Sequence, residues 1–99
     1  MATYTELYEL RQDSNILNKI TSAIAIKCKA VIDDGASTTG QKEWAREKIQ
    51  NPNGLKGQII WSLLVANKDQ SVSTIQNAND AAVQNNVNTA IDDLIADLT

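Results

Sequence analysis

The sequence contains no histidine and only one cysteine. Without an imidazole the chain lacks the commonest general base and the commonest transition-metal ligand of proteins, which excludes Ser-His-Asp, Cys-His and zinc-binding arrangements. The single thiol, Cys28, has no partner for a disulfide within the chain and is typical of a protein assembled in a reducing cytoplasm. We therefore expect no catalytic residues, no metal ligands and no cofactor, and we do not expect an enzyme.

Long apolar runs and evenly spread charge are also missing. No apolar run approaches the roughly 18 residues that a membrane-spanning helix needs, and the N-terminal segment carries acids where a signal peptide would carry bases. Residues 69–99 hold five acidic residues and no lysine or arginine, whereas residues 1–68 hold nine basic and seven acidic residues. An acidic segment repels the phosphates of nucleic acids. We therefore expect neither a membrane nor a nucleic acid as a direct partner.

Helical periodicity is the feature that the sequence has in abundance. Apolar residues recur at steps of three and four, as on one face of a helix, at Leu17, Ile20, Ile24, Cys28 and Val31. The pattern predicts helices over residues 4–11, 14–32, 41–50, 55–67, 71–78 and 80–97. We expect an all-α fold, with a single helical domain over residues 1–99 that forms a compact bundle of four to five helices with short loops.

The ends of these segments carry helix-capping residues. Thr3 followed by Glu6 has the spacing of a capping box, in which each side chain accepts a hydrogen bond from the backbone N–H of the other residue. Pro52 pushes Asn51 out of the α region, so a break is expected between the helices 41–50 and 55–67. Further N-caps are expected at Asp13 or Ser14, Thr38 or Thr39, Ser71 or Ser73, and Asn79.

The segment 55–67 is apolar on nearly every side, since only Ser62 interrupts the run IIWSLLVA. Such a run fits a buried helix or a buried strand, and we favour a helix because no second strand candidate exists to pair with it. This helix is predicted to be central, with Trp61 as the hub of the core. The other residues expected inside are Cys28, Ile59, Ile60, Leu63 and Leu64, then Trp44, Ala45, Lys48 and Ile49, and finally Val83, Val87, Ala90, Ile91, Leu94 and Leu98.

Five residues are candidates for a protein–protein interface. Tyr4 and Tyr8 lie one helical turn apart on a short N-terminal helix that could fill a groove of a partner. Trp44 lies on a short, charged helix, where core packing competes with a role as an interface anchor. Asp93 and Asp97 are expected on one helical face, in a segment with no base to neutralise them, which suits either a basic partner or a solvated surface.

Nearly the whole chain resembles small proteins encoded in tailed-bacteriophage genomes. The similarity is carried by TYTELYEL at residues 3–10, by LLVANKD at residues 63–69, and by V-x-x-I-x-x-A-x-D-A-A-V-Q-x-x-V at residues 72–87. No catalytic motif accompanies the resemblance. It implies a virion structural protein associated with the capsid, the neck or connector, or the tail, and made in the host bacterial cytoplasm. The implied partners are other virion proteins and copies of the chain itself in a symmetric assembly.

Two other classes of function stay open on the sequence alone. A small phage protein outside the virion that binds and regulates a host protein would have the same acidic, helical composition. An enzyme would have to rely on carboxylates. The neighbouring pairs Asp33–Asp34 and Asp92–Asp93 do not suit that role, because adjacent residues on a helix point in different directions and do not converge on one substrate.

Overall fold

The computed structural model describes all 99 residues, which form helices and no strand. The helices are α1 (Tyr4–Leu10), α2 (Ser14–Asp33), α3 (Thr39–Gln50), α4 (Asn53–Ala66), α5 (Val72–Gln76) and α6 (Asp80–Ile95). The predicted all-α bundle is confirmed. Each of the six segments predicted to be helical forms a helix of its own, so the bundle has six helices where four to five were expected, and the shortest are α1 with seven residues and α5 with five.

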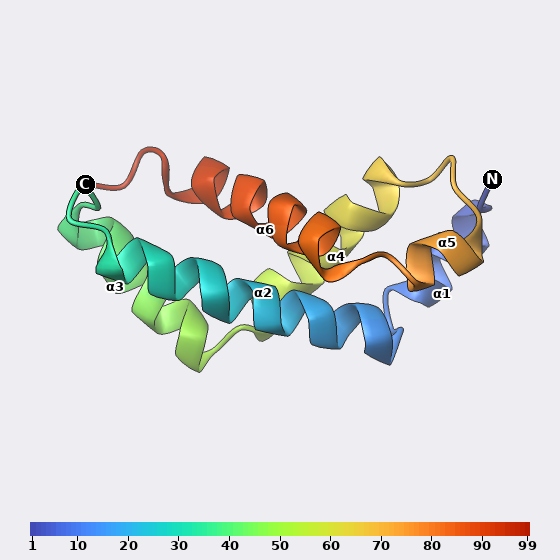
Figure 1. Ribbon diagram of the computed structural model, residues 1–99, viewed down its shortest axis with the longest axis horizontal. Coiled ribbons are helices and arrows are strands. Elements are labelled where there is room, and N and C mark those ends of the chain that lie inside the picture. The colour runs from blue at the N-terminus through green and yellow to red at the C-terminus, as the bar shows by residue number, and fades with distance from the viewer.

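The helices form an elongated bundle with extents of 42 × 21 × 21 Å. In Figure 1, α3 runs back along α2, and α6 lies along α2 in the same direction. Helix α4 crosses the bundle obliquely, while α1 and α5 pack together at the end that holds the N-terminus, opposite the C-terminus. Because α2 is the longest helix and contacts α3, α4 and α6, it is the central element.

Side-chain caps fix where most helices begin. The Thr3 hydroxyl accepts a hydrogen bond from the Glu6 N–H (3.1 Å), and the Glu6 carboxylate accepts one from the Thr3 N–H (2.9 Å), which lowers the pKa of Glu6. Thr38 forms a second capping box, with Gln41. The other predicted caps are made by Asp13, Ser71 and Asn79.

Four helix boundaries differ by two residues from those predicted, namely the starts of α3 and α4 and the ends of α5 and α6. Helix α4 begins at Asn53, two residues early, because the backbone of Pro52 is already in the α region and leads directly into the helix without a side-chain cap. Helix α6 ends at Ile95, so Asp97 lies in the turn that follows it.

A single apolar core of 19 residues draws on all six helices, and no polar or charged residue is buried in it. The predicted stripe of α2 is buried from Ile20 to Val31. Cys28 within it is completely buried, and desolvation raises the pKa of its thiol against a smaller opposing effect of Lys27 and Lys48. Cys28 therefore occupies a packing position, as predicted.

The prediction that segment 55–67 is the central helix, with Trp61 as hub, is wrong. Trp61 is half buried at the edge of the core. Helix α4 packs against the bundle along one side only, and that side is made of Leu55, Ile59, Ile60, Leu63 and Leu64. The remaining side of the helix is uncovered, because α2 already fills the centre of the bundle.

Two further residues predicted inside are exposed. The buried stripe of α6 continues from Ile91 to Ile95 at a step of four, which turns Leu94 outward. On α3, Ile49 is exposed because this helix buries only Ala45. Trp44 is half buried and packs against the core.

Three polar contacts join α2 to the segment 78–92. They follow the two helices in order: Lys19 Nζ to the Ala78 carbonyl (2.6 Å), Gln84 Nε2 to the Ala23 carbonyl (3.1 Å), and Lys27 Nζ to an Asp92 carboxylate oxygen (2.7 Å). The last contact supplies Asp92 with a base, so the expectation that nothing neutralises the acidic helix is wrong for this residue.

The C-terminal residues pack onto the start of α3. Three donors of α3 and its cap hold them: Thr38 Oγ1 to the Leu98 carbonyl (3.0 Å), Gln41 Nε2 to the Ile95 carbonyl (3.0 Å), and the Gly40 N–H to the Thr99 oxygen (3.2 Å). A Cβ atom at Gly40 would lie 2.6 Å from the Thr99 oxygen, so this approach requires glycine. The capping box of α3 thus also pairs carbonyl groups left free at the end of α6.

Candidate functional site

The uncovered side of α4 is the most unusual surface of the molecule. Successive residues of a helix are turned by about 100°, so the side opposite the buried one carries residues at steps of three and four. We call it the outer face of α4, and it consists of Gly57, Gln58, Trp61, Ser62, Val65 and Ala66. None of these residues is charged, and the side chain of Val65 is 42% exposed.

A surface helix normally places charged and polar residues on its solvent side, whereas a helix that is apolar all round is buried. Helix α4 has the apolar sequence of a buried helix, but it lies at the surface of the molecule. Exposed apolar surface is common at protein–protein interaction sites, so the outer face of α4 is a candidate docking surface.

An aromatic cluster on α1 borders the outer face of α4 on one side. The rings of Tyr4 and Trp61 meet edge to face, with centroids 5.9 Å apart and planes at 78°. The Arg11 guanidinium lies 3.9 Å from the centroid of the Tyr8 ring, and its Nε donates a hydrogen bond to the Tyr8 carbonyl. Tyr4 is 70% exposed and Tyr8 50% exposed. These side chains and Gly57 line a shallow hollow of about 310 Å³.

The residue types of this cluster are those that are enriched at protein interfaces. Tyrosine, tryptophan and arginine are the residue types most enriched among those that dominate binding energy at protein interfaces. Tyrosine and tryptophan offer large contact areas with few rotatable bonds, and the more flexible Arg11 side chain is held on Tyr8 by contacts within the chain.

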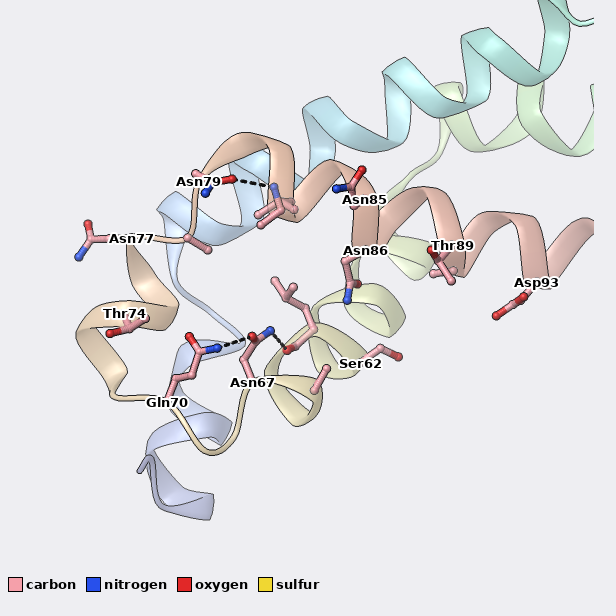
Figure 2. A pocket seen from close by; sticks show the side chains of 16 residues that line it. Ser62, Asn67, Gln70, Thr74, Asn77, Asn79, Asn85, Asn86, Thr89 and Asp93 are labelled. Carbon is pink, nitrogen blue, oxygen red and sulfur yellow. Dashed lines mark hydrogen bonds between the residues drawn. The ribbon is translucent and has the colours of Figure 1, made fainter.

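A polar groove of about 880 Å³ borders the outer face of α4 on the other side, between α4, α5 and α6. Its lining combines small or apolar side chains with amides and hydroxyls, and Asp93 is the only charged residue in it. Figure 2 shows the polar residues Ser62, Asn67, Gln70, Thr74, Asn77, Asn79, Asn85, Asn86, Thr89 and Asp93.

Some polar groups of the groove are already engaged and others are free. Asn67 donates a hydrogen bond to the Leu63 carbonyl (2.8 Å) and accepts one from Gln70 Nε2 (3.1 Å). By contrast, Asn86 and Thr89 make no side-chain hydrogen bond within the chain, and Asn86 extends from α6 toward α4 in Figure 2. The groove therefore offers both donors and acceptors to a partner.

The structure brings together some of the predicted interface residues. Tyr4 and Tyr8 belong to one cluster, but their aromatic neighbour is Trp61. Trp44 lines neither hollow and lies with Lys48 Nζ 5.8 Å from its ring centroid. Asp93 lines the groove, whereas Asp97 lies beyond the end of α6. The prediction that Asp93 and Asp97 share a helical face is therefore wrong.

Arg11, Gly57 and Trp61 are members of the site that the sequence patterns did not indicate. The signal for Gly57 and Trp61 was the long apolar run of segment 55–67, which is difficult to surround in a chain of 99 residues because a domain of this size buries only about two-thirds of its surface. An apolar helix that cannot be covered internally predicts an external partner.

No group of three or more His, Cys, Asp or Glu side chains is placed to hold a metal ion. None of the helices is both long enough and apolar enough to cross a bilayer. Comparisons with protein-family models, with curated proteins and with solved structures found no match to this chain.

Proposed function

We propose that this chain is a bacteriophage virion structural protein, a capsid-, neck- or tail-associated subunit that acts by protein–protein assembly. The observation that carries the proposal is the uncharged outer face of α4, bordered by the aromatic cluster and by the amide-lined groove. The resemblance of the sequence to phage-encoded proteins supports the virion as the place of assembly.

Symmetric assembly suits a surface of this kind. In a particle the same contact recurs many times, so contacts that are modest in one pair of subunits become strong in the whole. A chain with a small core and an uncovered apolar helix then gains part of its stability from its neighbours.

Mass spectrometry of purified particles tests the location. We expect the chain at a stoichiometric copy number in particles freed of soluble lysate proteins. Absence from the particles contradicts the virion role, and recovery of the chain bound to a host protein would instead favour a regulatory one.

A pair of substitutions tests the surface. Val65→Asp places a charge on the outer face of α4, where assembly would bury it without a partner, so incorporation into particles should fall to roughly a tenth or less. Ile26→Asp is the matched control, because Ile26 is also an exposed β-branched residue, 61% exposed, but lies on α2 outside the face. Equal incorporation of the two variants would show that the outer face of α4 is not the assembly surface.

A further inference from the structure

The charges around the outer face of α4 restrict what can cover it. The face has no charged residue, although the chain carries a net charge of −3. Two copies can therefore bring this face together without like charges opposing one another in the contact. A surface that meets itself in this way forms a closed pair around a two-fold axis.

Each border of the face contributes one unpaired charge. Arg11 lies on the α1 side, in the hollow that contains Gly57, and it forms no ion pair within the chain. Asp93 lies on the α6 side, in the groove that contains Ser62, and it also forms no ion pair. Gly57 and Ser62 are five residues apart, which is about 7.5 Å along the helix at 1.5 Å per residue, so the two hollows reach α4 within two turns of one another.

We propose that the partner on the outer face of α4 is a second copy of this chain, related by a two-fold axis parallel to α4, with Arg11 of each copy beside Asp93 of the other. Rotation about such an axis exchanges the two borders, so the α1 side of one copy covers the α6 side of its neighbour. An axis across α4 would instead put Arg11 against the border that holds the neighbour's Arg11. The inference rests on the assembly role proposed above.

The shapes of the two borders also fit this arrangement. It sets the exposed Tyr4 and Tyr8 of one copy over the amide-lined groove of the other, where Asn86 and Thr89 have free hydrogen-bonding groups. A tyrosine suits such a mixed lining, because its ring packs on apolar groups while its hydroxyl bonds to polar ones. Both borders are thus used twice in each pair of subunits.

The available area is large enough for a stable pair. A specific interface covers about 800 Å² on each subunit. The chain has an accessible surface of 5869 Å², and the contact would lie on the long side of a molecule with extents of 42 × 21 × 21 Å. An interface of that size would cover about one-seventh of the surface.

Charge exchange tests the arrangement in solution. Sedimentation equilibrium of the wild type, from micromolar to millimolar concentration, should give twice the subunit mass of 10.8 kDa. Arg11→Asp and Asp93→Arg, made singly, turn two symmetric attractions into repulsions and should each raise the dissociation constant about tenfold or more. The two changes combined restore opposite charges and should return the constant to within about threefold of the wild type.

The controls carry the same changes of charge on α2, outside the face. Lys29→Asp and Asp33→Arg should leave the dissociation constant unchanged. Circular dichroism should first show equal helix content in all variants. A wild type that is monomeric throughout, or a combined variant that associates no better than the single ones, overturns the two-fold pair. These results are independent of the virion role: a pair in solution that is missing from particles supports the pair and overturns only that role.

Discussion

At the scale of a single residue, the buried thiol of Cys28 links the stability of the fold to pH. Burial raises its pKa above the ordinary value of 9.0. Below pH 9.0 the thiol is neutral in both states, so its full contribution to stability is present. As the pH rises further, the thiol ionises in the unfolded chain while it stays neutral in the folded one, and the contribution is lost as the pH passes the raised pKa.

The substitution Cys28→Ala removes this titration. At neutral pH we expect it to lower the free energy of unfolding by about 1–2 kcal/mol, because a completely buried sulfur atom is lost. Urea denaturation followed by circular dichroism should show the difference between variant and wild type shrinking from neutral pH to about pH 10. A difference that stays constant over this range would contradict a raised thiol pKa.

Trp61 and Leu64 show, on neighbouring sides of one helix, how burial determines the cost of truncation. Leu64 is completely buried, and Leu64→Ala should cost about 2–5 kcal/mol. Trp61 is half buried, and Trp61→Ala in the dissociated chain should cost only about 1–2 kcal/mol despite its larger side chain. Urea denaturation at low protein concentration measures both values. A larger loss of unfolding free energy for Trp61→Ala would indicate that Trp61 lies at the centre of the core.

At the scale of a helix, the two threonine capping boxes have different surroundings. The box of Thr3 is exposed and serves only α1. The box of Thr38 is half buried, and its hydroxyl also donates to the Leu98 carbonyl. One cap of α3 therefore serves two helix ends at once.

This difference predicts unequal costs for the same substitution. Thr3→Ala should lower the free energy of unfolding by about 0.5–1 kcal/mol, and Thr38→Ala by about 2 kcal/mol because it also leaves a carbonyl without its donor. Thermal denaturation of the two variants side by side measures this. Similar losses would show that the contact with the C-terminal residues contributes nothing to stability.

Local signals in the sequence predicted the helices well because caps and breaks depend on neighbouring residues. Thr3, Asp13 and Asn79 act as caps through hydrogen bonds that span three positions. The exposed side of α4 was not predictable in this way, because a helix that is apolar on all sides has no preferred direction. Which side faces solvent is decided by the other helices, and the two sides of α4 are assigned only when α2 occupies the centre of the bundle.

The candidate site was likewise predictable only where it depends on residues that are close in the sequence. Tyr4 and Tyr8 were identified from their spacing of one turn, which is a local property. Their aromatic neighbour Trp61 is more than fifty positions away in the chain and reaches Tyr4 only through the packing of α1 against α4. Asp97 was misplaced because the end of α6 is fixed by hydrogen bonds to α3, and those bonds are also remote in sequence.

At the scale of the whole molecule, the apolar core does not by itself fix the position of α6 along α2. The buried stripe of α6 is Val83, Val87, Ile91 and Ile95, a repeat of four β-branched residues at equal steps. If α6 slid along α2 by one turn, three of the four positions would still receive a valine or an isoleucine. The core has no buried polar group to distinguish the two alignments.

The ordered polar contacts between α2 and the segment 78–92 distinguish the two alignments, so their value lies in the uniqueness of the native state. Replacing Lys19 with Met and Gln84 with Leu should change the free energy of unfolding by less than about 1 kcal/mol, because exchange of polar contacts for apolar ones is often neutral. Amide resonances of α6 should nevertheless broaden or double in nuclear magnetic resonance spectra. Lys29→Met is the control, because its partner Asp33 lies on the same helix and their ion pair does not depend on how α6 is aligned with α2. A single sharp set of resonances in the double variant would mean that packing alone selects one alignment. Broadened or doubled resonances would mean that a few polar contacts at the margin of the core keep the helices of this small protein aligned.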